Sequence, residues 1–231
     1  LKIKRNFFCI FHVFSKNFEW SNLKVNKLHL MNTITAAITA VGAYVPDFVL
    51  TNKALEAMVD TNDEWITSRT GIKERRILKD EDKGTSFLAI KAAQDLLAKG
   101  NIDPLEIDLV IMATATADMP VAATGVYVAT EIGATNAFAY DLQAACSSFL
   151  YGMSAAAAYI QSGRYKKVLL IGADKMSSIV DYTDRSTCII FGDGAGAVLF
   201  EPNYEGLGLQ DEYLRSDGVG RDFLKISAGG S

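Results

Sequence analysis

The sequence predicts an α/β fold, with a mostly parallel sheet and a buried central helix. Of the 231 residues, 49% are apolar, which is enough to build a sizeable core. The runs at 109–113 and 167–172 are continuously apolar, as in strands buried on both faces. Helix-like segments separate these runs, and strands that alternate with helices form parallel βαβ units.

The central helix is predicted from residues 141–163, DLQAACSSFLYGMSAAAAYIQSG. No Asp, Glu, Lys or Arg occurs from Leu142 to Gly163, and a helix without a charged face must be covered by protein on every side. The small residues at 154–158 would let another helix approach closely, and Gly163 is a typical helix stop. The run exceeds the ~18 residues that suggest a membrane span, but its two Gln and four Ser argue against one.

The elements before this helix follow from periodicity and capping residues. Alternation and Gly42 predict a strand over 38–45. Asn52 is expected to cap a short helix that runs to about Val59, and Thr61 with Glu64 forms a capping box for a second helix. A helix from Ser86 to Gly100, a strand at 109–113, a helix over 121–132 and a strand over 137–142 complete this part.

After the central helix the sequence predicts strands at 167–172, 188–190 and 197–200. Gly192, Gly194 and Gly196 lie between the last two, and a strand rather than a helix follows them. A tight bend is therefore favoured over a phosphate-binding loop. Cys188 is interpreted as a core residue because it lies in an apolar run. The tail over 207–231 shows short strand-like pieces between glycines.

Residues 1–30 differ in composition from the rest of the chain. They carry a net charge of +5, which leaves −9 for residues 31–231, and no basic stripe suggests nucleic-acid binding. We interpret them as a translated upstream extension, with Met31 as the start, because no small-residue cleavage site follows the apolar run. The three cysteines are sparse and odd in number, which favours a reducing, cytoplasmic compartment.

Two positions are candidates for chemistry. Cys146 is expected where a strand meets a helix N-terminus, and the helix dipole there favours a thiolate nucleophile; the alternative is a cysteine that packs as a small core residue. Trp65 and Arg69 are four residues apart, so they share one helix face. An aromatic ring beside a guanidinium suits an adenine ring and a phosphate, and the alternative is an ordinary surface cation–π pair.

The motifs DTNDEWITSRTGI, DLQAACSSF and DRSTCIIFGDGAGA, in this order, resemble the amino-terminal half of the β-ketoacyl-acyl-carrier-protein synthase III family. The resemblance covers about residues 32–231. It implies a thiolase-like fold of two similar halves in five αβαβα layers, with the central helix packed against its counterpart, and a homodimer. Residues 31–204 would then form the amino-terminal half, and residues 205–231 would begin the connection to a carboxy-terminal half that the chain lacks.

The resemblance also implies roles for individual residues. Cys146 would take an acyl group from acetyl-CoA or a short acyl-CoA, and malonyl-acyl-carrier protein would then condense with it to a 3-oxoacyl product. Acyl-CoA is a substrate in this reaction, and neither a cofactor nor a metal is implied. The binding residues carried over by motif are Trp65 and Arg185 around the adenine, Arg69 on the phosphate side, Thr61 at the nucleotide and Phe191 in the acyl tunnel.

One departure from the family pattern limits the prediction. The family's decarboxylating His and Asn are not found, because no His follows His29 and only Asn203 follows Cys146. We therefore expect the chain to be inactive in condensation by itself. The alternatives are a non-catalytic fragment or interaction domain on half a thiolase fold, and another thiolase-fold acyl-CoA condensing enzyme. An α/β-hydrolase is disfavoured, since its nucleophile elbow would need glycines at Ala144 and Ser148.

Overall fold

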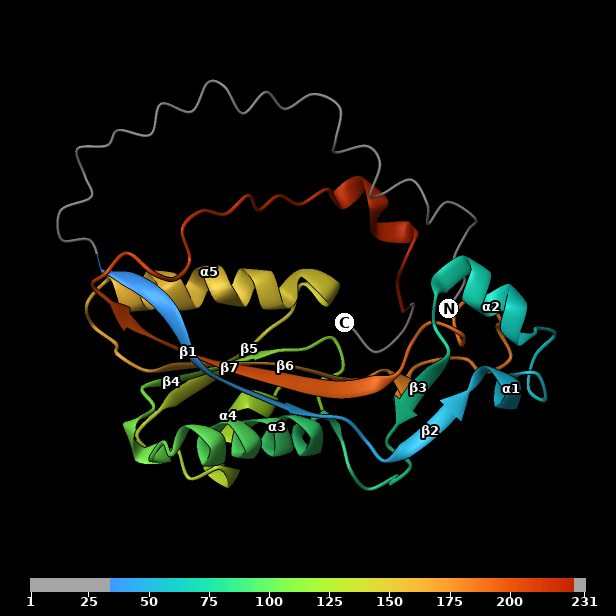
Figure 1. Ribbon diagram of the computed structural model, residues 1–231, viewed down its shortest axis with the longest axis horizontal. Helices are drawn as coiled ribbons and strands as arrows, with labels where there is room; N and C mark the ends of the chain where they lie inside the picture. Colours follow the sequence, from blue (N-terminus) through green and yellow to red (C-terminus); the bar gives the residue numbers. More distant parts are fainter. Residues whose placement is uncertain (1–33, 227–231) are drawn as a thin grey trace. The chain divides into compact units, whose positions relative to one another are not determined.

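A computed structural model of the chain describes residues 34–226 (Figure 1), so the predictions for residues 1–30 lie outside the described residues. Contacts divide the chain into two compact units. The larger unit is Ile34–Leu214, and residues 215–226 are the described part of the other. Within 215–226 the only regular element is a 3₁₀ helix, Gly218–Asp222. Up to residue 226 no strand follows residue 203, so the strand-like tail is wrong over that range.

The larger unit is built on a five-stranded mixed sheet in the order β1-β7-β6-β4-β5. β5, β4 and β6 are parallel, whereas β7 runs antiparallel to both β6 and β1. The prediction of a mostly parallel sheet therefore holds only for β5, β4 and β6. No α-helix lies between β6 and β7 to carry the chain back along the sheet, and β7 pairs antiparallel with β6. The strands are β1 (Thr35–Tyr44), β4 (Leu109–Ala113), β5 (Phe138–Leu142), β6 (Val168–Lys175) and β7 (Asp193–Asn203).

Helices cover both faces of this sheet (Figure 1). α3 (Thr85–Gly100) and α4 (Thr124–Glu131) share one hydrophobic core with Val110 and Met112 of β4. Helix α5 (Ser148–Gln161) shares a second core with Leu109 and Ile111 of the same strand. Because successive residues of a strand point to opposite faces, β4 supplies both cores, and the expected α/β layering is confirmed.

A second, two-stranded sheet was not predicted. β2 (Phe48–Thr51) pairs antiparallel with β3 (Glu74–Ile77), and α1 (Asn52–Leu55) and α2 (Asp63–Thr70) lie between them in the chain. These elements enclose a small core of their own with the segment before β7. That core consists of Leu50, Leu55, Ile66, Ile77, Cys188 and Ile189.

The predicted caps of the two short helices are wrong. Thr51 rather than Asn52 caps α1, and its hydroxyl accepts from the Ala54 N–H at 3.1 Å. Asn62 rather than Thr61 caps α2, accepting from the Trp65 N–H at 2.8 Å. Amides and hydroxyls compete closely for this position, so a one-residue shift costs little. The helix expected to reach Val59 ends at Leu55.

The glycine-rich segment before β7 also differs from the prediction. Residues 188–190 lie in hydrogen-bonded turns, not in a strand, and Gly194 and Gly196 lie inside β7. Gly192 alone sits at a close approach, because a Cβ there would lie 3.1 Å from both Arg75 Cβ and the Arg76 carbonyl oxygen. The predicted close backbone approach is thus confirmed at Gly192. Cys188 is fully buried, as predicted.

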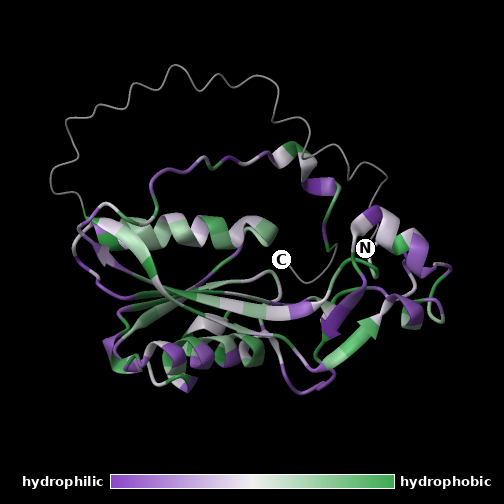
Figure 2. Cartoon of the chain, viewed as in Figure 1, coloured by the Kyte–Doolittle hydropathy of each residue, from purple (hydrophilic) through white to green (hydrophobic). Residues whose placement is uncertain are grey.

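Helix α5 is only partly covered within the described residues. Leu150 on its outer side is 56% exposed, and Figure 2 shows α5 mostly in pale to hydrophobic colours, whereas α3 carries several hydrophilic positions. The segment after β7 runs alongside it, where Glu212 accepts a hydrogen bond from Ser154 at 2.8 Å. The expectation of burial on every side is not met, because the sheet covers only the inner side. Within residues 34–226, no helix is long and apolar enough to span a membrane.

Candidate active site

Cys146 lies in the connection from β5 to α5. It occupies a 3₁₀ turn, Ala145–Ser147, directly before the first residue of α5. Ala145 adopts a left-handed φ of 48°, and the Ser148 hydroxyl accepts a hydrogen bond from the Ala144 N–H at 2.6 Å. The Cys146 side chain is exposed. The alternative of a buried core cysteine is therefore wrong for Cys146, whose thiol is open to a reagent or a substrate.

The strand that delivers this turn is fixed by Asp141 of β5. Its carboxylate accepts hydrogen bonds from the N–H groups of Thr124 at 2.8 Å and Gly125 at 2.7 Å, at the start of α4. A negative charge is favourable there because it faces the positive end of the helix dipole. Asp141 thus joins β5 to α4 just before the chain turns toward Cys146.

A cluster of one aromatic ring and two guanidinium groups forms on α2 and a distant turn. The Cζ atom of Arg69 lies 4.4 Å from the ring centroid of Trp65, which confirms that both residues share one helix face. The Cζ atom of Arg185 lies 4.9 Å from the same centroid. Arg185 also donates to the Asp60 carbonyl oxygen at 2.8 Å. We call Trp65, Arg69 and Arg185 the clamp.

Hydrogen bonds hold the turn that carries Arg185. The Asp184 carboxylate accepts from the Ser186 N–H at 2.9 Å, from the Ser186 hydroxyl at 2.6 Å and from the Thr187 hydroxyl at 3.0 Å. Burial acts to raise the pKa of Asp184, but these hydrogen bonds outweigh it and lower the pKa overall. The ionised carboxylate is therefore the form that stabilises this turn.

The remaining predicted site residues are less closely connected. The Thr61 hydroxyl is buried and has no hydrogen-bond partner, and Phe191 is half-buried just before β7. Over residues 34–226, no hydrogen bond or ion pair joins Cys146 to the clamp or to Phe191. The structure thus brings Trp65, Arg69 and Arg185 together, and the binding roles of these residues, Thr61 and Phe191 stay predictions.

The sequence analysis missed two buried polar residues behind the clamp. Arg75 of β3 and Asn52 of α1 are 4% and 1% exposed, and the Arg75 guanidinium donates to the Asn52 side-chain oxygen at 2.7 Å. Burial lowers the pKa of Arg75. No sequence signal marked this arginine, because the alternating burial of ERRI at 74–77 is visible only in the structure.

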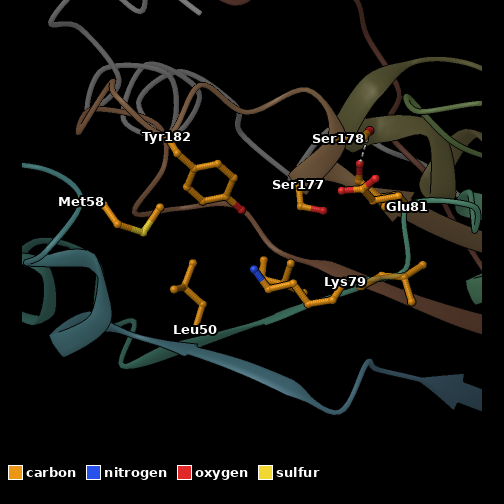
Figure 3. Close-up of a pocket in the computed structure, with 10 residues that line it drawn as sticks. Leu50, Met58, Lys79, Glu81, Ser177, Ser178 and Tyr182 are labelled. Atoms are coloured by element: carbon orange, nitrogen blue, oxygen red, sulfur yellow. Dashed lines mark hydrogen bonds between the residues drawn. The ribbon is translucent and has the colours of Figure 1, made fainter.

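One cavity lies away from the thiol and the clamp. It has a volume of about 390 Å³, and Figure 3 shows Tyr182, Met58 and Leu50 around one end of it. None of the predicted site residues lines it. Cavity size is a general guide to ligand sites, but here the exposed thiol and the clamp lie outside the cavity, so we base the site on them. The lining residues are Leu50, Met58, Ile77, Leu78, Lys79, Glu81, Lys175, Ser177, Ser178 and Tyr182. No cluster able to hold a metal ion occurs among the described residues.

Comparison with known proteins agrees with this architecture. A family model described as 3-oxoacyl-[acyl-carrier-protein] synthase III matches residues 140–218. A β-ketoacyl-acyl-carrier-protein synthase III from Bacteroides thetaiotaomicron is 56% identical over 201 residues, which is 87% of this chain and 60% of the relative. One from Porphyromonas gingivalis is 55% identical over the same shares. The chain thus spans about 60% of the length of the curated relatives it matches.

Solved structures give the same result. The synthase III from Thermus thermophilus superposes with a TM-score of 0.79 at 44% identity, covering 83% of this chain and 59% of that one. For the enzyme from Aquifex aeolicus the TM-score is 0.69 at 48% identity, with 72% and 53% covered. Fold and site therefore define an α/β protein of the thiolase-like class. Within that class, the chain is similar to β-ketoacyl-acyl-carrier-protein synthase III enzymes over 87% of its own length.

Proposed function

We propose that Cys146 accepts an acyl group from acetyl-CoA or another short acyl-CoA, in the reaction that initiates fatty-acid synthesis. The Cys146 sulfur attacks the thioester carbonyl; a new carbon–sulfur bond forms, and the bond to the coenzyme A sulfur breaks. Coenzyme A leaves as a thiolate that takes up a proton. The observation that carries the proposal is an exposed cysteine between β5 and α5 in a chain that also assembles the clamp.

In the second step, malonyl-acyl-carrier protein would lose carbon dioxide and attack the Cys146 thioester, giving a 3-oxoacyl-carrier protein. General acid–base or electrostatic groups typically contribute ~10²- to 10⁴-fold to such a step. No His follows His29 in the sequence. We therefore expect these 231 residues alone not to catalyse condensation. We propose that the complete reaction takes place in a cytoplasmic homodimer, with no metal or further cofactor.

The clamp supports binding of the adenine of acyl-CoA. Trp65 and Arg185 face each other at 4.9 Å, but an adenine ring between them needs ~7 Å, twice the ~3.5 Å contact distance of stacked atoms. Arg185 would thus withdraw by ~2 Å as the ring enters. This movement breaks the ion pair with Asp60 at 3.5 Å and the hydrogen bond to the Asp60 carbonyl oxygen at 2.8 Å. Both contacts are exposed, so water can replace them and the movement costs little.

The first test follows acylation of the chain itself. Incubation with acetyl-CoA should add one acetyl group at Cys146, detected by mass spectrometry, and Cys146→Ala should remove it. Cys188→Ala is the matched control and should keep it, since Cys188 is buried. Acetylation at Cys188, or retained acetylation in Cys146→Ala, would contradict the assignment and favour a non-catalytic fragment.

The second test addresses the clamp. Trp65→Ala removes the stacking surface, so acyl-CoA should bind more weakly by about 1 kcal/mol or more, as measured by calorimetry. Trp65→Phe should keep most of the affinity because it retains a ring. Unchanged affinity in Trp65→Ala would show that Trp65 and Arg69 form only an ordinary surface cation–π pair.

One observation favours a second candidate within the same class. A priming β-ketosynthase of a polyketide pathway is 36% identical with a TM-score of 0.71, over 75% of this chain and 52% of that one. A polyketide-priming role would use the same acylation of Cys146. The starter acyl-CoA that is transferred fastest would separate the two roles.

A further inference from the structure

We infer that Arg75 and Asn52 are positioning residues for the adenine clamp, setting the separation between α2 and the turn that carries Arg185. This inference rests on the proposed function. It starts from an unusual feature: Arg75 is a buried cation that makes no ion pair within the described residues. An unpaired buried charge is costly, so its hydrogen bonds must connect parts of the fold that need a fixed spacing.

Arg75 holds the turn on one side of the clamp. Its Nε and Nη2 atoms both donate to the Ile189 carbonyl oxygen, at 3.1 and 2.6 Å. Ile189 is itself buried and lies four residues after Arg185, in the same set of hydrogen-bonded turns. The planar guanidinium fixes distance and direction together, so it places the backbone from which Arg185 reaches Trp65.

Asn52 holds α2 on the other side. Its side-chain N–H₂ donates to the Asp63 carboxylate at 2.7 Å, to the Thr67 hydroxyl at 3.3 Å and to the Ile72 carbonyl oxygen at 2.8 Å. Asp63 and Thr67 flank Trp65 on α2. The Asn52 side-chain oxygen accepts from Arg75 Nη1 at 2.7 Å, so one amide connects the tryptophan's helix to the guanidinium.

These contacts close a ring. It runs from Trp65 through α2 to Asn52, from Asn52 to Arg75, from Arg75 to Ile189, and back through the turn to Arg185 over Trp65. Gly192 packs against Arg75 Cβ at the end of the same turn. Asn52, Arg75 and Ile189 are buried, whereas Asp63 and the clamp lie at the surface, where the ring opens to a ligand. Arg75 and Asn52 do not touch the ligand; they act through the residues that do.

The test compares two acyl donors. The assay measures the rate of Cys146 acetylation by acetyl-CoA and by S-acetylpantetheine, which lacks the adenine nucleotide. Arg75→Lys keeps the positive charge but loses the planar guanidinium that bonds Ile189 and Asn52. The preference for acetyl-CoA should then fall by about tenfold or more, since a ~1 Å misplacement of the residues that bind the substrate can cost up to ~10²-fold. The rate with S-acetylpantetheine should not change.

The chain offers a matched control on the same strand. Arg76 neighbours Arg75 on β3 but donates only to the Pro46 carbonyl oxygen, at 3.3 Å, and lies 3.8 Å from Glu74. Arg76→Lys should leave the preference unchanged. In an Arg185→Ala background, Arg75→Lys should have no further effect, because the residue through which it acts is absent.

A second variant covers the case in which Arg75→Lys does not fold. Asn52→Asp still accepts from Arg75 but loses the donors to α2, so it should also lower the preference for acetyl-CoA. An unchanged preference in either folded variant, an equal loss with both donors, or failure of both variants to fold would overturn the inference. If Trp65→Ala abolishes the preference and Arg75→Lys does not, the inference alone fails. If the unaltered chain shows no preference, the proposed function fails with it.

Discussion

Helices α3 and α5 pack on opposite faces of one sheet, yet they differ in what their outer sides offer. α3 buries its inner side and carries Lys91, Asp95 and Lys99 elsewhere along its length. α5 also buries an inner side, but it has no charged residue at all. An amphipathic helix such as α3 needs no further protein contact, because its polar side is stable in water. The outer side of α5 is instead composed for contact with protein, so the two faces of the sheet are not equally complete.

The largest expected difference concerns two leucines. Leu96 of α3 is fully buried and Leu150 of α5 is 56% exposed. Leu96→Ala should lower the free energy of unfolding by about 2–5 kcal/mol, whereas Leu150→Ala should change it by no more than about 0.5 kcal/mol, as measured by urea unfolding. Equal losses would mean that another protein surface covers Leu150 in solution, and the loss at Leu150 would then depend on protein concentration.

Two glycines, one at the contact of each helix with the sheet, allow a second comparison of how α3 and α5 pack on the sheet. A Cβ at Gly42 of β1 would lie 2.4 Å from the Ala92 carbonyl oxygen of α3, whereas one at Gly152 of α5 would lie 2.5 Å from the Leu170 Cδ1 atom. Backbone cannot move aside as a side chain can. Gly42→Ala should therefore destabilise by about 1–3 kcal/mol.

Gly152→Ala should cost less, because alanine raises helix propensity by ~1 kcal/mol and offsets part of the strain. Thermal unfolding of both variants checks the order. The reverse order would show that α5 packs on β6 more rigidly than α3 packs on β1.

The smallest effect on stability is expected from a charge on the open side of α5. Leu150→Lys should leave the free energy of unfolding within about 0.5 kcal/mol but reduce binding of a hydrophobic dye and narrow the size distribution in light scattering. Val126→Lys is the control, since Val126 of α4 is 51% exposed on the other face. If Val126→Lys lowers dye binding as much as Leu150→Lys, the exposed apolar surface is not concentrated on α5.

The fold could be predicted where the signal was local. The strand at 109–113 and the helix ending before Gly163 follow from short apolar runs and a single glycine, and the structure confirms both. The antiparallel return of β7 could not be predicted, because its direction is fixed in part by pairing with β1, which lies far away in the chain. The β2–β3 pair was missed because ERRI contains three charged residues.

The candidate site shows the same difference between local signals, which could be predicted, and long-range contacts, which could not. The Trp65–Arg69 contact follows from a spacing of four residues, and the structure confirms it. The pairing of Trp65 with Arg185 came only from the family resemblance, since no local pattern links them, and the structure brings them together. Arg75 was missed because its partner Ile189 is 114 residues away. A buried arginine has no sequence signature until its partners are known.

The pairing of the first strand with the last has a consequence for synthesis on the ribosome. Thr35 of β1 faces Asn203 of β7, 168 residues later. At ~5–20 residues per second, β1 waits roughly ten to thirty seconds for β7, its neighbour in the described sheet. During that interval its backbone N–H and C=O groups stay open to other chains, and α3 is the first described helix made that contacts it, followed by α5. Nascent chains should therefore depend on chaperones most strongly between the completion of α3 and the emergence of β7.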